Sequence, residues 1–183
     1  MKKQVEGKIF EMDGWNPTTL EERIRRLEDI EKIKEVMHEY CRCADQNDPD
    51  GMIACFTEDC VISMAHDDRE GMMWKDRASA QKFYRSALID YVISGSHFIC
   101  NEQILFENQD SAIMYMYMYS WQRFMGYPER ADCHRWGRYE NHYVREADGQ
   151  WRMKGLRLLS SGEYGGARIG EQFNRDWPPV CTK

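Results

Sequence analysis

Residues 111–125 of the chain read SAIMYMYMYSWQRFM, and this stretch indicates how the second half of the sequence folds. Met114, Met116 and Met118 alternate with large aromatic residues, so an extended strand would point the methionines to one face and the rings to the other. The aromatic residues of that second face are Tyr115, Tyr117, Tyr119 and Trp121. We therefore expect both faces to be buried, one by core or ligand and the other by a neighbouring subunit.

The same period of two continues on either side of this strand. Residues 96–106 precede it across the polar turn ENQD, and residues 133–146 and 150–160 follow it, joined at Asp148-Gly149. An Asp-Gly pair between two alternating segments is a strong hairpin signal. The sequence therefore predicts four successive antiparallel strands in its second half.

The first half of the chain has helical spacing instead. NPTTLEER (16–23) has the pattern of a helix start, and NDPDG (47–51) ends that helix. The apolar positions of this first helix fall on one arc, formed by Leu27, Ile30, Ile33, Met37, Tyr40, Cys41 and Ala44. We predict that it is followed by a short helix near 50–56, a strand at 60–64, a charged loop at 65–77 and a third helix at 78–92.

Helices followed by successive antiparallel strands predict an α+β domain. A strongly bent sheet folded over about three helices would enclose a cone-shaped, largely apolar pocket. We expect this domain to span residues 17–162, with an N-terminal arm at 1–16 and a C-terminal surface tail at 163–183.

The composition argues against several functional classes. The 183 residues include 42% hydrophobic and 31% charged residues, an ordinary balance for a folded globular domain. The net charge of −6 provides no basic surface for a nucleic acid, and no apolar run approaches the length of a membrane span. The N-terminal segment lacks the apolar core of a secretion signal and the seven cysteines are an odd number, so we expect reduced thiols and a cytoplasmic protein.

Asp45 is an unusual residue for its position, because it lies at the edge of the apolar arc, five residues after Tyr40. An isolated carboxylate on a buried face is costly, so it requires a partner. Two interpretations are open at this point. Asp45 either pairs with a side chain inside the pocket or caps the turn NDPDG, where such residues are common. A histidine in a strand, such as His97 in the predicted strand 96–106, is often only a half-buried, hydrogen-bonded residue.

Three segments together resemble the SnoaL-like branch of the NTF2-like superfamily: DIEKIKEVMHEYCRCAD (29–45), SGSHFICNEQILF (94–106) and GRYENHYVREADGQWRM (137–153). The order of elements fits the same branch over residues 18–160. Within it, the chain is most similar to the bile-acid 7α-dehydratases, and more distantly to scytalone dehydratase and the hexachlorocyclohexane dehydrochlorinases. The resemblance implies a carbon–oxygen lyase that uses neither a metal nor another cofactor and forms a homo-oligomer, with a trimer favoured.

The resemblance also implies a catalytic pair. The tyrosine-then-aspartate pattern of the family matches Tyr40 and Asp45, and its strand histidine matches His97, so Asp45 would orient His97. A histidine held by a carboxylate is a suitable base at neutral pH. Removal of a proton next to a carbonyl would allow the elimination of water from a hydrophobic, polycyclic or steroid-like ketone, as in steroid or polyketide metabolism. Tyr40 would contact the carbonyl or the departing hydroxyl group.

Further residues are candidates for substrate binding. They are Tyr117, Tyr119 and Trp121 as a pocket wall, His134 as a second acid or orienting group, and Arg157 in the last strand. For His134, a surface or interface position is the competing interpretation. Ser120 and Ser160 stand where the bile-acid dehydratases carry a second aspartate and an arginine, so the resemblance leaves the substrate open.

Other functions are compatible with the same features. A polyketide cyclase or isomerase would use the same base without expelling water. A non-catalytic β-subunit of a ring-hydroxylating dioxygenase would copurify with an iron–sulfur partner. A ligand carrier would bind an apolar compound and release it unchanged.

Overall fold

A computed structural model of the chain describes residues 13–66, 69–124 and 132–164. Along the chain, its elements are α1 (Leu20–Asp45), α2 (Pro49–Ala54), β1 (Phe56–His66), β2 (Arg69–Trp74), α3 (Arg77–Arg85), the π-helical turn η2 (Ser86–Tyr91), β3 (Val92–Asn108), β4 (Ser111–Phe124), β5 (Cys133–Arg145) and β6 (Trp151–Tyr164). The strands form one sheet in the order β2-β1-β6-β5-β4-β3. Within it, β1 and β6 pair in parallel and the other neighbours are antiparallel.

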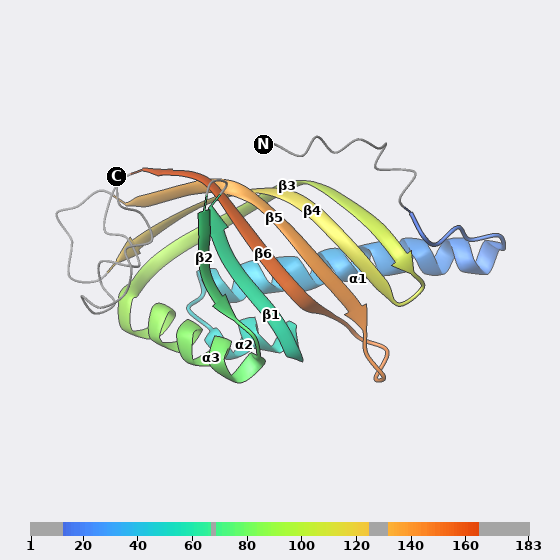
Figure 1. The fold of residues 1–183 in the computed structure, drawn as a ribbon, viewed down its shortest axis with the longest axis horizontal. Helices are drawn as coiled ribbons and strands as arrows, with labels where there is room; N and C mark the ends of the chain where they lie inside the picture. The colour runs from blue at the N-terminus through green and yellow to red at the C-terminus, as the bar shows by residue number, and fades with distance from the viewer. Residues whose placement is uncertain (1–12, 67–68, 125–131, 165–183) are drawn as a thin grey trace.

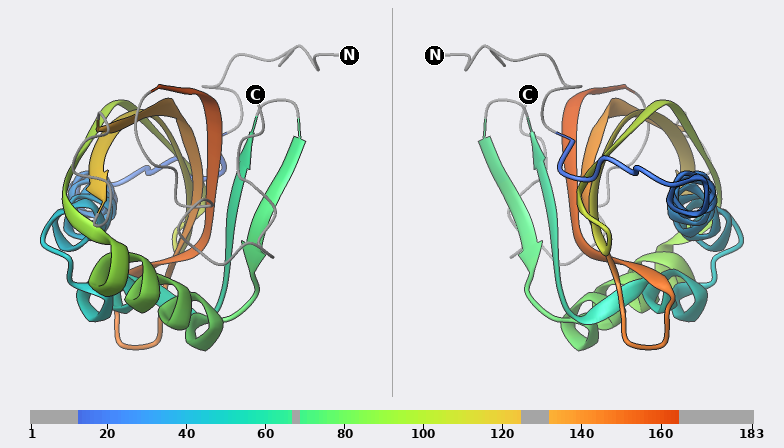
Figure 2. Two further views of the ribbon diagram at one scale, coloured as in Figure 1. Left: turned by 90° about the vertical axis from the view of Figure 1, so that its left-hand side faces the viewer. Right: turned by 90° about the vertical axis from the view of Figure 1, so that its right-hand side faces the viewer.

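The sheet is strongly curved and does not close into a barrel (Figure 1). In the end-on views of Figure 2 it arches over one side of an interior, and α1, α2 and α3 cover the other side. Two irregularities in the pairing of β5 with β6 accompany the bend, and at each of them β6 has one extra residue, Ser161 and Lys154. Such irregularities bend strands and increase their twist. The predicted α+β architecture is confirmed.

Helix α1 begins as the sequence indicates, with a capping box between Thr19 and Glu22. Its buried residues are Asp29, Ile33, Met37, Tyr40, Cys41, Cys43 and Ala44. The predicted arc was wrong at Leu27, which is 65% exposed, because the buried face is rotated toward Asp29. Tyr40 lies on this buried face, and the partly exposed Asp45 is the last residue of the helix.

The region 65–77 differs from the predicted loop. β1 extends to His66, and Arg69–Trp74 forms the edge strand β2, which pairs with β1 from Ile62 opposite Trp74 to His66 opposite Arg69. The many charged residues of this segment led to the prediction of a loop, although it forms the strand β2, which pairs with β1, the strand just before it in the chain. The first strand also begins earlier than predicted, at Phe56.

The two faces of β4 have opposite environments. Met114, Met116 and Met118 are at most 5% exposed and face the interior, whereas Tyr117 and Tyr119 are 57% and 40% exposed on the outer face. Within a single chain, the expectation that both faces are buried therefore holds only for the methionine face. The aromatic face lies on the side of the sheet that no described helix covers (Figure 2).

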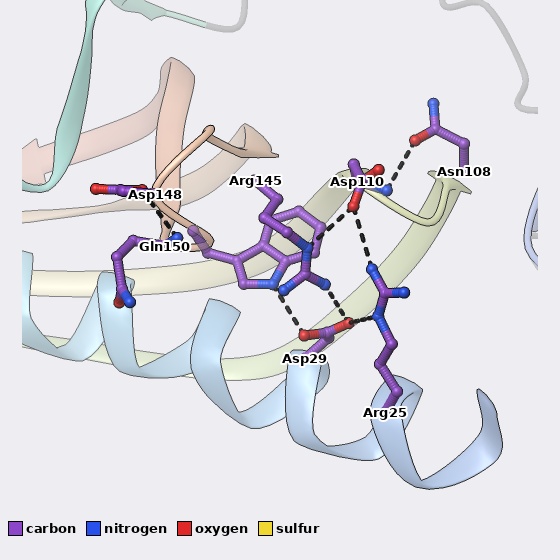
Figure 3. Close-up of polar contacts among 8 residues, drawn as sticks. Arg25, Asp29, Asn108, Asp110, Arg145, Asp148 and Gln150 are labelled. Atoms are coloured by element: carbon purple, nitrogen blue, oxygen red, sulfur yellow. Dashed lines mark hydrogen bonds and ion pairs between the residues drawn. The ribbon is translucent and has the colours of Figure 1, made fainter. Parts of the chain in front are cut away.

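A buried ionic cluster joins α1 to the far end of the sheet (Figure 3). Asp29 is 1% exposed, and its carboxylate accepts hydrogen bonds from Arg145 of β5 and, at 3.1 Å, from the Trp151 indole of β6. Asp110 contacts both Arg145, at 3.0 Å, and Arg25, at 3.3 Å. These contacts fix the orientation of α1 relative to the strands, and with it the position of the residues at the end of the helix.

The segment before α1 is packed where the structure describes it. Trp15 is buried, with its ring 5.1 Å from that of Phe106. The rest of the predicted N-terminal arm, residues 1–12, and the tail from residue 165 lie outside the described residues.

Most of the described cysteines are buried. Burial raises the pKa of both Cys41 and Cys55 to about 12, whereas Cys100 is exposed. Because the thiolate is the reactive form, iodoacetamide at pH 8 should modify Cys100 well before Cys41 or Cys55 in the folded protein. Peptide mass spectrometry over time, with the urea-unfolded chain as control, tests this order. Equal rates at the three sites in the folded protein would contradict it.

Candidate active site

The structure brings Asp45 and His97 together. The His97 imidazole Nδ1 lies 2.6 Å from Asp45 Oδ1, and the His97 backbone N–H donates to Oδ2 at 3.1 Å. A carboxylate is an acceptor, so Nδ1 carries the hydrogen of the neutral ring. Nε2 is then the nitrogen with a free lone pair, which is the arrangement that a general base requires.

The turn after α1 holds Asp45 in place. Asn47 has a positive φ of 55°, and its side-chain amide donates to the carbonyl oxygens of Val92, at 3.1 Å, and Ile93, at 3.4 Å. Asparagine tolerates this left-handed conformation better than most residues. The end of α1 is thus tied to the first residues of β3, the strand that carries His97.

His97 lines a cavity between the sheet and the helices. Its apolar lining includes Met52, Met64, Phe83, Leu88, Met118 and Leu158. The polar lining residues are Tyr40, Tyr84, His97, Ser120, Gln122, Arg135 and Tyr139. A mainly apolar cavity with a few converging polar groups is the usual form of a small-molecule site.

Tyr40 lies in this cavity and is buried. Its hydroxyl is 3.2 Å from the hydroxyl of Tyr84, a residue of α3. Burial raises the pKa of Tyr40 well above 10.0, and burial likewise raises the pKa of Tyr84. Both phenols therefore keep their protons at neutral pH and remain hydrogen-bond donors.

Alkaline pH should destabilise the fold through its buried tyrosines. Burial raises the pKa of Tyr40, Tyr84, Tyr139 and Tyr143 above the ordinary 10.0. Above pH 10 the unfolded chain releases these protons and the native chain retains them, so the free energy of unfolding should fall as the pH rises. Absorbance titration should show one group of tyrosines ionising early and another only on unfolding. Reversible ionisation of all tyrosines near pH 10, with the fold intact, would contradict this.

A polar row crosses the sheet beside the catalytic candidates. His97 of β3 is directly opposite Ser120 of β4, and Ser120 is opposite Arg135 of β5. Residues in register across a sheet share a face. Ser120 and Arg135 therefore accompany His97 on the inner face.

The other predicted substrate-binding residues do not line the cavity. Tyr117 and Tyr119 are exposed on the outer face, Trp121 pairs there with His134, and the Nδ1 of His134 contacts the Tyr119 hydroxyl at 2.5 Å. Arg157 pairs with Glu140 at 3.0 Å on a half-exposed surface. Their assignment to the pocket was therefore wrong. The alternating pattern of β4 correctly separated two faces, but the face with Met118 and Ser120 lines the cavity, not the face with the tyrosines.

Among the described residues, no group of three or more His, Cys, Asp or Glu side chains is arranged to hold a metal ion. In the same residues, no helix is long and apolar enough to cross a membrane.

A model of the SnoaL-like domain matches residues 25–157, most of the chain. The chain belongs to the SnoaL-like family. No curated protein matches the sequence significantly.

Solved structures confirm the SnoaL-like fold. A candidate scytalone dehydratase from Novosphingobium aromaticivorans has a TM-score of 0.71 and 24% identity, over 80% of this chain and 93% of that one. The hexachlorocyclohexane dehydrochlorinase LinA-type3 from Novosphingobium barchaimii has a TM-score of 0.67 and 15% identity, over 80% of this chain and 96% of that one. At these identities the similarity establishes the fold.

Sequence reasoning missed Tyr84, Arg135 and Tyr139 as cavity residues of this SnoaL-like domain. Tyr84 lies in the helix predicted at residues 78–92, in which no site residue was predicted. Arg135 and Tyr139 are in the same strand as His134, and choosing the other face of that strand would have found both. The methionines of β4 mark the buried face of that strand, and Ser120 lies on the same face. Because Arg135 is opposite Ser120 in β5, it belongs to the buried face as well.

Proposed function

We propose that the protein is a cofactor-independent lyase, a dehydratase that removes water from a hydrophobic ketone-bearing substrate. The observation that carries this proposal is the Asp45–His97 pair, 2.6 Å apart, whose histidine lines a mainly apolar cavity. The relatives named as a dehydratase and a dehydrochlorinase support an elimination, since both names describe the loss of a small group from neighbouring carbons.

The proposed reaction uses His97 Nε2 as the base. It removes the proton next to the substrate carbonyl, and the electron pair of that C–H bond forms an enolate. Collapse of the enolate creates the new carbon–carbon double bond and breaks the C–O bond of the β-hydroxyl group. The departing hydroxide takes a proton from the His97 imidazolium and leaves as water, which regenerates the base.

Asp45 is a positioning residue in this scheme. It fixes the tautomer of His97 and stabilises the positive charge that the ring acquires. Tyr40 is placed to donate a hydrogen bond to the carbonyl or departing oxygen, because it lines the cavity and keeps its proton. The Tyr40–Tyr84 contact holds that hydroxyl group in place.

The proposed substrate class follows from the lining of the cavity. Methionine, phenylalanine and leucine side chains surround the polar groups, so a largely apolar substrate suits the site. The polycyclic or steroid-like part of the proposal rests on the family resemblance. A panel of β-hydroxy ketones of increasing ring number tests the proposal. An enone with the mass of the substrate less one water supports it. A product of unchanged mass would instead indicate an isomerase or cyclase, and no turnover of any panel member would count against the lyase.

We also propose that the protein is a homo-oligomer, with a trimer favoured, assembled through an outer aromatic patch. This patch consists of Phe98, Tyr117, Tyr119, Trp136 and Tyr164, all at least 40% exposed. Phe98, Tyr119 and Trp136 are opposite one another on three adjacent strands. An apolar area of this kind is typical of an interface.

Replacing Trp136 by glutamate should dissociate the oligomer, because a charge would be buried in its interface. Light scattering after size-exclusion chromatography measures the mass. Leu27→Glu, which adds the same charge at an exposed apolar residue of α1, is the matched control and should leave the mass unchanged. A monomeric wild-type protein, or an unchanged mass for Trp136→Glu, would overturn the assembly.

The proposed compartment is the cytoplasm. Five described cysteines, Cys41, Cys43, Cys55, Cys60 and Cys100, are free, and free thiols are typical of a reducing environment.

A further inference from the structure

Arg135 occupies a buried position whose function the lyase mechanism does not explain. The polar row of β3 and β4 continues through Arg135 to Glu163 of β6, its register partner. The Arg135 side chain is only 13% exposed. A guanidinium remains charged under all ordinary conditions, so this interior contains a permanent positive charge.

The contacts of Arg135 leave part of this group unused. Its Nη2 is 3.6 Å from Glu163 Oε2, which is within ion-pair range but too long for a hydrogen bond. Among the described residues, the buried Nε of Arg135 has no hydrogen-bond partner. A buried donor without a partner is costly, which is a reason to look for a ligand that satisfies it.

A second unsatisfied group lies in the same place. Arg135 lines both the cavity of His97 and a smaller cavity between β1, β2 and β6, and Ser160 lines the smaller one with it. The Ser160 hydroxyl is also buried without a hydrogen-bond partner in the described part of the chain. The side chains of Arg135 and Ser160 therefore line one small cavity, two and three strands away from the strand of His97.

We propose that Arg135 and Ser160 form a subsite for a carboxylate of the substrate. This inference rests on the proposed function and narrows its substrate class to ketones that carry an acidic group. Neighbouring strands are about 4.8 Å apart, so the backbones at His97 and Arg135 are separated by about 10 Å. The carboxylate would thus bind at one end of the substrate while His97 acts at the other.

The chemistry of the subsite favours an anionic oxygen over a neutral one. Arginine presents a planar fork of donors that matches a carboxylate, and charge-assisted bonds are stronger than neutral ones. Glu163 opposes the anion, but its distance from Arg135 leaves the guanidinium only partly compensated. The Ser160 hydroxyl adds an uncharged donor on the β6 side.

Binding of a matched pair of probes tests the subsite without any need for turnover. Calorimetric titration at pH 8 compares trans-cinnamate with trans-cinnamamide, which differ in charge at one end of the same flat body. The wild-type protein should bind cinnamate at least about tenfold more tightly, the size expected for hydrogen bonds to a charged group. Arg135→Gln should abolish that preference.

Three further variants make the test specific. Arg157→Gln removes an equal charge from an outer arginine and should keep the preference. His97→Gln should also keep it, so that failure of the lyase mechanism is distinguished from failure of the subsite. If Arg135→Gln fails to fold because the Glu163 carboxylate loses its contact with Arg135, the double variant Arg135→Gln, Glu163→Gln replaces it, because this variant removes both charges. The subsite is overturned if the wild-type protein does not prefer cinnamate to cinnamamide, or does not bind cinnamate at all. It is also overturned if either Arg135 variant keeps the preference.

Discussion

Replacing His97 by glutamine should lower kcat for the dehydration by about 10²–10⁴-fold, the usual contribution of a positioned general base. Glutamine has a similar reach but cannot accept and hold a proton. Its amide can still hydrogen-bond to Asp45, so the 2.6 Å contact is replaced without creating an unpaired carboxylate. The fold should therefore remain intact while the chemistry is lost, which circular dichroism and steady-state kinetics together measure.

Asp45→Asn provides the second half of this test. An asparagine amide can donate to Nδ1 and would favour the tautomer with the hydrogen on Nε2, which is the wrong one for a base. We expect kcat to fall by at least about 10²-fold with little change in KM, because Asp45 acts through His97. His142→Gln, at an exposed position of β5, is the matched control and should behave as wild type. Loss of activity in the control, or full activity in His97→Gln, would contradict the assignment.

Asp29→Ala should destabilise the fold by about 3–5 kcal/mol, the usual cost of breaking a buried ion pair. The substitution leaves the largely buried Arg145 without its nearest counter-charge and the Trp151 indole N–H without its acceptor. Domains of ordinary stability have about 5–15 kcal/mol in total, so the variant should unfold at much lower urea concentration. Urea denaturation followed by tryptophan fluorescence measures the difference.

Asp110→Ala is the matched control for this prediction. It removes another carboxylate that touches Arg145, but Asp110 is 60% exposed. Exposed ion pairs contribute about 0–1 kcal/mol, so this variant should be nearly as stable as wild type. If the two variants lose the same amount, the buried cluster does not anchor α1 as the structure suggests.

The architecture was largely predictable from the sequence because its signals are local. The capping box of Thr19 and Glu22 marks the start of α1, and the Asp148-Gly149 pair marks the last hairpin. No local signal of this type predicts that Asp45 and His97 lie close together. The two residues are 52 positions apart, so only the resemblance to a family connected them before the structure did.

The wrong predictions for the faces of β4 and for β2 have one physical cause. A local sequence pattern does not indicate which other elements a strand packs against. The alternation in β4 identified two faces, but which face turns inward depends on α1 and on the register with β3 and β5. This is why Tyr117 was placed in the pocket and Arg135 was overlooked. Similarly, β2 is a strand because β1 offers it an edge, which its own charged sequence does not reveal.

Exchange with deuterated solvent measures directly whether His97 removes a proton next to a carbonyl. Proton nuclear magnetic resonance can follow the α-hydrogens of the panel ketones in deuterium oxide, with wild-type protein and with His97→Gln. We expect enzyme-dependent exchange for at least one ketone and the loss of this exchange in the variant. Exchange that is equally fast with His97→Gln, or none above the uncatalysed rate with wild-type protein, would contradict it.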